Sequence, residues 1–131
     1  MVSATLGGIP LRTTTWWADP TIGTTTGTTP VRCWQGDLHV PGPVAIATTG
    51  VWGGTVMGLK GGSNHAKIGV STDPTQPYAI FGDLNQQGTV SGTCTSSQNG
   101  RGGTFYVVTE KVLVDGLTDL IKGETAPVVT E

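Results

Sequence analysis

Short apolar stretches, each bounded by glycine, proline or polar residues, dominate the pattern along this chain. Residues 11–17 (LRTTTWW) are β-branched and aromatic, and two further apolar stretches cover residues 65–71 and 78–82. Strands have this length and composition, because β-branched and aromatic side chains pack well on a pleated sheet. We therefore expect three strands here. The last two are separated by a turn that contains Asp73 and two prolines, which predicts a hairpin.

Other segments alternate between strand-like and loop-like composition. Residues 44–57 form an apolar run interrupted by glycines, which predicts one or two strands with a bulge or a sharp bend. Residues 103–108 (GTFYVV) predict another strand. By contrast, residues 19–30 and 86–103 are rich in small polar residues and glycine. We expect an exposed loop in the first of these and a long, mobile loop in the second.

One segment near the end of the chain has helical periodicity. Its apolar residues recur at helical spacing at Leu113, Leu117, Leu120 and Ile121. The pattern predicts a helix over residues 110–122, with Thr109 as the N-cap and Gly123 as the stop. Residues 124–131 are expected to form a loose tail or an edge strand.

Composition supports a mainly β fold of one domain. The chain has 131 residues, with 21 Gly and 8 Pro, and the best helix-forming residues are scarce. We expect a single α+β domain over residues 1–131, mainly sheet, with a C-terminal helix packed on it. The N-terminus lacks the features of an export signal, and no apolar run is long enough to cross a membrane, so a soluble chain is expected.

The net charge of -2 is unevenly distributed. Basic and acidic residues balance over residues 1–110, and the whole deficit falls in residues 111–131, where two lysines face four acidic residues. A protein that binds nucleic acid through many phosphates usually carries a basic surface. Tight, non-specific wrapping of DNA is therefore disfavoured, whereas engagement of a single phosphate is not.

The two cysteines, Cys33 and Cys94, leave two alternatives open. They form one disulfide, or they remain two buried thiols, and their separation in the sequence does not decide between these. Neither cysteine has the close Cys or His neighbours that zinc ligation requires. We expect no metal and no cofactor.

The candidate chemistry begins with His65 and Lys67. In a strand, residues two apart project from the same face, so an imidazole and an ammonium group side by side could hold a phosphodiester. Downstream, Asp83 and Asn85 share a face in the same way and could orient the imidazole. Arg101 lies in a glycine-rich stretch, where a guanidinium and nearby backbone N–H groups could bind phosphate oxygens.

The order of these elements resembles the C-terminal half of the deoxyribonuclease II family, a branch of the phospholipase D superfamily. The matching pieces read NHAKIGVS, PYAIFGDLN and GRGGTF, followed by the predicted helix. The resemblance is close over residues 64–105 and looser upstream, where LGGIPLRTTTWW and PVRCW are similar to the family's preceding strand and cysteine-bearing loop. It implies a phospholipase D-like sheet.

The resemblance also implies roles for individual residues. His65 corresponds to a catalytic imidazole, Lys67 to a phosphate ligand and Asn85 to a supporting polar group, while Asp83 and Arg101 match motif positions that would bind substrate. In this superfamily one histidine attacks phosphorus to form a phosphohistidine, a second protonates the leaving oxygen, and water completes hydrolysis without a metal. A DNA endonuclease is the implied activity.

The chain departs from the family in having a single His-x-Lys motif, where deoxyribonuclease II has two. Its other histidine, His39, is followed by Val40 and Pro41 and is interpreted as a loop residue without a catalytic role. Gly69 stands where the family has a cysteine after the motif, and Gln86 stands where it tends to have an arginine. A homodimer or larger assembly would supply the second motif by symmetry.

Two other functional classes fit the same sequence. A non-catalytic structural or assembly module, such as a shell or tail component, would explain the low charge, the Thr- and Gly-rich composition and the single motif. A lipid hydrolase of the phospholipase D type is disfavoured because the chain lacks an amphipathic basic face. The four tryptophans could stack on bases, although core or interface packing is the more frequent use of Trp.

Overall fold

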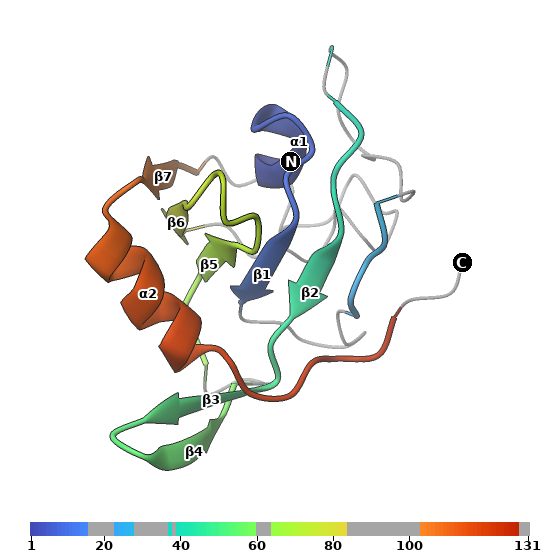
Figure 1. Cartoon of the computed structure of the whole chain (residues 1–131). Coiled ribbons are helices and arrows are strands. Elements are labelled where there is room, and N and C mark those ends of the chain that lie inside the picture. Colours follow the sequence, from blue (N-terminus) through green and yellow to red (C-terminus); the bar gives the residue numbers. More distant parts are fainter. Residues whose placement is uncertain (16–22, 28–36, 38, 60–63, 84–102, 129–131) are drawn as a thin grey trace.

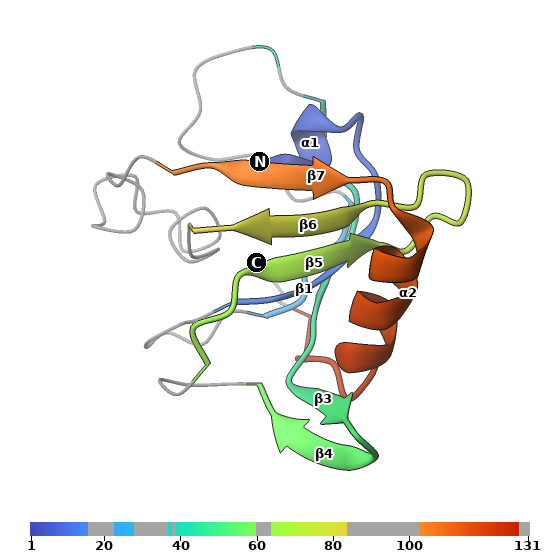
Figure 2. The ribbon, with the colours of Figure 1, turned by 90° about the vertical axis from the view of Figure 1, so that its left-hand side faces the viewer.

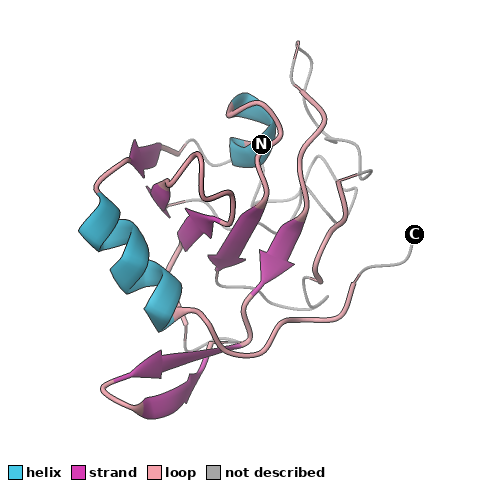
Figure 3. Ribbon diagram, in the orientation of Figure 1, coloured by secondary structure: helices cyan, strands magenta, loops and turns pink. Residues whose placement is uncertain are grey.

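The computed structural model describes residues 1–15, 23–27, 37, 39–59, 64–83 and 103–128. These residues form a mixed α+β fold that is mainly sheet, with a C-terminal helix packed against it, as predicted. Figure 3 shows a larger sheet and a separate small hairpin. The elements are α1 (Val2–Thr5), β1 (Leu11–Thr14), β2 (Val44–Ile46), β3 (Thr49–Trp52), β4 (Thr55–Gly58), β5 (Ile68–Ser71), β6 (Ala79–Gly82), β7 (Phe105–Val108) and α2 (Lys111–Leu120).

The larger sheet has the strand order β2-β1-β5-β6-β7. β1 and β2 run parallel, and every other neighbouring pair is antiparallel. β5 and β6 form the predicted hairpin, and the strands predicted over residues 11–17 and 103–108 are confirmed over Leu11–Thr14 and Phe105–Val108. In the turn of the hairpin, Asp73 Oδ1 accepts hydrogen bonds from the backbone N–H and the hydroxyl of Thr75. These bonds favour the charged carboxylate and lower the pKa of Asp73.

The two faces of the sheet bury two hydrophobic clusters. Because successive side chains of a strand point to opposite faces, Ala79 and Ile80 of β6 belong to different clusters. α1 packs on one face and α2 lies along the other (Figure 1). The cluster beside α1 contains Ile9, Leu11, Val44, Ile46, Ile80 and Ala126. The cluster under α2 contains Ala47, Leu59, Val70, Ala79, Val114, Leu117 and Ile121.

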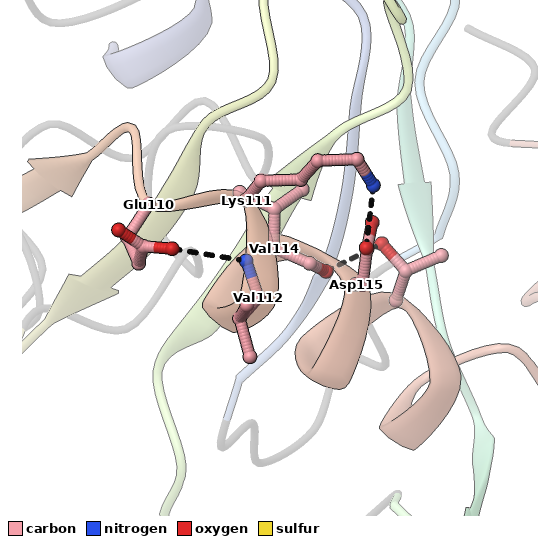
Figure 4. A network of polar contacts seen from close by, with 6 residues as sticks. Glu110, Lys111, Val112, Val114 and Asp115 are labelled. Atoms are coloured by element: carbon pink, nitrogen blue, oxygen red, sulfur yellow. Dashed lines mark hydrogen bonds and ion pairs between the residues drawn. The ribbon is translucent and has the colours of Figure 1, made fainter.

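The helix predicted near the C-terminus is confirmed, but its N-cap is Glu110 and not Thr109. The Glu110 carboxylate accepts a hydrogen bond from the backbone N–H of Val112 at 3.3 Å (Figure 4). Lys111 pairs with Asp115 one turn later, and both side chains are exposed. An acidic group beside the first N–H groups of a helix is favourable, because these groups have no partner within the helix.

Arg12 of β1 binds the residues that follow α2. Its guanidinium donates to the carbonyl oxygens of Ile121 at 2.5 Å, Gly123 at 2.6 Å and Glu124 at 3.0 Å, and to Thr125 Oγ1 at 2.5 Å. The carbonyls at the end of a helix lack donors within the helix. Arg12 binds the carbonyl of the C-cap Ile121 and two carbonyls beyond it, and so holds the end of α2 against the sheet. Partial burial of the guanidinium lowers the pKa of Arg12.

Residues 44–58 contain three strands, where one or two were predicted. β3 and β4 pair as a hairpin whose two turn residues, Gly53 and Gly54, both have positive φ, at 54° and 81°. A two-residue hairpin turn of this kind needs left-handed backbone, which glycine adopts without steric cost. The hairpin packs beside α2, where Gly50 lies so close to the Leu120 carbonyl that a side chain would collide with it.

One prediction of loose structure is wrong. Thr25 belongs to the segment expected to be an exposed loop, but it is buried and exchanges backbone hydrogen bonds with Val44. Of the two alternatives for residues 124–131, a loose tail or an edge strand, residues 124–128 come nearer to the edge strand, because Thr125 and Val128 form isolated β-bridges with Ala47 and Thr24. Short helix α1 was not predicted at all.

Gly123 is expected to tolerate no side chain. A methyl group there would overlap the backbone carbonyl and the hydroxyl of Thr49, which also accepts a hydrogen bond from the Glu124 N–H. We predict that Gly123→Ala lowers the free energy of unfolding by about 1–3 kcal/mol, measured by urea titration.

The control for that prediction is Gly116→Ala in α2. A methyl group at Gly116 meets no atom within 4 Å, so this substitution should stabilise the protein by roughly 0.4–1 kcal/mol through helix propensity. Equal effects of the two substitutions would contradict the close approach of Gly123 and Thr49.

Candidate active site

The start of β5, the end of β6 and the start of β7 lie at one end of the sheet, and α2 lies toward the other (Figure 2). This end carries the described candidate residues His65, Lys67 and Asp83. Asn85 and Arg101 lie outside the described residues, as do Cys33 and Cys94. No helix among the described residues is long and apolar enough to cross a membrane.

The prediction that residues 65–71 form one strand is wrong at its first residues, since β5 begins at Ile68. The ladder extends backwards by one further bond, from the Gly82 N–H to the Lys67 carbonyl at 2.9 Å. His65 and Ala66 precede it in irregular backbone, where the Ala66 N–H donates to Asn64 Oδ1 at 3.0 Å. Side-chain bonds of this kind compete with strand pairing.

Asn64 anchors the segment that carries the motif. Its side-chain amide donates to Thr14 Oγ1 at 2.8 Å and to the Leu59 carbonyl at 2.7 Å. Three separate parts of the chain therefore meet at one amide group, directly before His65. Sequence reasoning missed this role, although an Asn immediately before the motif was a visible signal.

Lys67 folds back onto the residue that carries the imidazole. Its Nζ donates to the backbone carbonyl of His65 at 2.7 Å. Lys67 is partly buried and His65 is exposed. An ammonium group has three donors, so two remain for other acceptors such as phosphate oxygens. The bond keeps a fixed cation beside His65 at the surface of the protein.

Asp83 follows β6 and binds the residue that precedes β7. Its Oδ1 accepts a hydrogen bond from the backbone N–H of Thr104 at 3.0 Å, which joins the end of β6 to the start of β7. An ionised carboxylate accepts hydrogen bonds and cannot donate one to a phosphate oxygen. This geometry favours a positioning role for Asp83 over the direct substrate contact expected from the sequence.

Other candidate groups lie elsewhere. His39 is exposed in irregular backbone, in agreement with its interpretation as a loop residue. Trp52 and the outward side of α2 line an apolar groove of about 530 Å³. In the described part of the chain, no three His, Cys, Asp or Glu side chains gather closely enough to hold a metal ion.

Comparison with known proteins adds no relative: no protein-family model, no curated protein and no solved structure matches this chain.

Proposed function

We propose that this chain is a metal-independent phosphodiesterase that hydrolyses DNA and whose active site is completed by a second copy of the chain. The observation that carries the proposal is the 2.7 Å hydrogen bond from Lys67 Nζ to the His65 carbonyl. It holds the Lys67 ammonium group against the backbone of His65, an exposed residue, and an ammonium and an imidazole are the two groups that the deoxyribonuclease II-like motif requires. The balanced charge of residues 1–110 agrees with local engagement of one phosphate.

The proposed reaction has two steps. His65 attacks the phosphorus, the bond to the leaving oxygen breaks, and the imidazole of His65 in the second copy gives that oxygen its proton. In the second step this imidazole takes a proton from water, the water oxygen attacks the phosphohistidine, and the P–N bond breaks to release a phosphate monoester. The two Lys67 ammonium groups offset the negative charge that develops on the phosphoryl oxygens.

A second copy is needed because the chain contains one His-x-Lys motif and the reaction uses two imidazoles. A twofold axis beside His65 would supply both from identical chains. The test is cleavage of supercoiled plasmid in EDTA by dimers refolded from equal amounts of wild-type chain and His65→Ala chain.

If both histidines serve one reaction, only dimers of two wild-type chains are active. We then expect about one quarter of the activity of the same total amount of wild-type dimer. An activity of about one half would mean that each chain acts separately. A requirement for added divalent metal would contradict the proposed chemistry altogether.

The edge strand β7 favours a second candidate function, a structural or assembly module. Among the described residues β7 is the last strand of the sheet, and its residues Phe105, Tyr106 and Val107 are exposed. An unpaired apolar edge is a surface on which further chains can add strands. Light scattering after size exclusion separates the two functions, since a stable dimer favours the enzyme, whereas a monomer or a large ring favours the module.

A further inference from the structure

Lys67, which directly precedes β5, forms one row with Gly82 at the end of β6 and Phe105 at the start of β7. Gly82 lies opposite Phe105 in the pairing of β6 with β7, and the Gly82 N–H bonds the Lys67 carbonyl on its other side. Residues directly opposite each other in neighbouring strands project from the same face. The register therefore puts the side chains of Lys67 and Phe105 on the same face of the sheet. Gly82 lies between them and has no side chain to separate them.

The ring of Phe105 occupies the space above Gly82. A Cβ on Gly82 would overlap two carbons of the ring and would lie 3.3 Å from a third, so the ring lies directly across the glycine backbone. Phe105 nevertheless keeps 37% of its surface exposed. Within the described residues no strand pairs with the outer edge of β7. The ring is thus supported from beneath by backbone and is open to solvent.

A cation and an open aromatic surface, separated by a bare glycine, match the two parts of a nucleotide. Lys67 and Phe105 lie two strand spacings apart, about 10 Å, and the ring shortens this gap because it leans over Gly82. The phosphate of a nucleic acid needs a cation, and every base has a flat face that stacks on aromatic side chains. A single strand of nucleic acid could therefore place a phosphate on Lys67 and a neighbouring base on Phe105 at the same time.

We propose that Phe105 is a base-stacking subsite for the nucleotide next to the phosphate bound by Lys67 and His65. This inference rests on the proposed function and names its substrate class. Both faces of a base inside a duplex are covered by its neighbours, so stacking on Phe105 requires an unpaired or flipped base. The site therefore prefers single-stranded DNA or unpaired segments to intact duplex.

Tyr106 provides a matched control. It follows Phe105 directly and is more exposed, at 65%, but it lies opposite Phe81 and projects from the α2 face of the sheet. If single-stranded DNA bound to any exposed aromatic side chain, removing either ring would weaken binding. If it stacks at a subsite beside Lys67, only removal of the Phe105 ring weakens binding. Phe105→Leu keeps the apolar contact with Gly82 and removes the ring, and Phe105→Tyr keeps the ring.

The test measures binding of a fluorescein-labelled oligothymidylate by anisotropy, all in the His65→Ala background so that the probe is not cleaved. We expect Phe105→Leu to weaken single-strand binding roughly 5- to 100-fold, the range for loss of one stacked base, and to change binding of a blunt duplex less than about twofold. Phe105→Tyr and Tyr106→Leu should match the parent, and thermal melts establish that each variant is folded.

Three outcomes would overturn the subsite. They are absence of single-strand binding in the parent, equal losses for single strand and duplex in Phe105→Leu, and an equal loss in Tyr106→Leu. If Phe105→Leu does not fold, the folded variants Phe105→Tyr and Tyr106→Leu decide. Loss of single-strand binding in Phe105→Tyr would overturn the subsite. Unchanged single-strand binding in both variants would support it. Failure of the phosphodiesterase itself is recognised separately, as absence of plasmid cleavage in EDTA by wild-type protein that binds the oligonucleotide.

Discussion

His65→Ala is expected to reduce plasmid cleavage in EDTA by about 10⁴-fold or more, because the proposed reaction loses both its nucleophile and its acid in one substitution. His65 is exposed, so its removal should leave the free energy of unfolding nearly unchanged. Initial rates of conversion of supercoiled to nicked plasmid are the measurement, with urea titrations on the same samples.

The matched control is His39→Ala, since His39 is the only other histidine and is also exposed. Its rate should stay within about twofold of wild type. Lys67→Met should fall between the two, because it removes the cation that contacts the His65 carbonyl and leaves the imidazole. Cleavage that survives His65→Ala would remove the basis of the proposed function.

Arg12→Met is expected to lower the free energy of unfolding by about 2–4 kcal/mol, the largest stability effect that we predict. The guanidinium donates to the carbonyls of Ile121, Gly123 and Glu124, and a thioether can replace none of these bonds. Met retains the apolar stem, so the loss reports mainly on the carbonyls of Ile121 and Gly123, since the Glu124 carbonyl keeps its hydrogen bond from the Thr48 N–H. Urea titration measures it.

Two variants calibrate this prediction. Arg12→Lys keeps the charge but has no planar fork, and it should lie between wild type and Arg12→Met. Lys111→Met breaks an ion pair with Asp115 in which both side chains are more than half exposed, and it should cost no more than about 0.5 kcal/mol. If Arg12→Met costs as little as Lys111→Met, the guanidinium does not hold the end of α2.

Local patterns predicted the elements whose partners are near in sequence. The period of the apolar residues identified α2, and the composition of the turn after Ser71 identified the hairpin of β5 and β6. The buried residues of α2 are Val114 and Leu117, and the C-cap Ile121 is buried beside them, while Leu113 lies at the exposed border. Periodicity locates a helix better than it locates the centre of its buried face, which depends on what packs against it.

The features that the sequence did not predict depend on hydrogen bonds between residues far apart in the chain. Asn64 binds Thr14, fifty positions away, and this contact holds the irregular backbone that precedes β5. Thr25 is buried because it pairs with Val44, although its own neighbours are polar and small. Of the candidate site, the spacing of His65 and Lys67 predicted two side chains on one face of a strand, but β5 begins only at Ile68, and the bond between the two residues ends on a backbone carbonyl. The place of Phe105 beside them depends on the pairing of β6 and β7 and was not.

The late position of Ala126 in the chain has a consequence for biosynthesis. Ala126 belongs to the cluster beside α1. Its N–H donates to the Ile46 carbonyl, and its carbonyl accepts from the Thr24 hydroxyl. A ribosome that adds about 5–20 residues per second reaches Ala126 about 4–16 s after Ile46. During that interval the cluster beside α1 lacks Ala126 on the nascent chain, although α1, β1 and β2 have already been synthesised. Chaperones that hold exposed apolar strands therefore have several seconds in which to bind this protein before it closes.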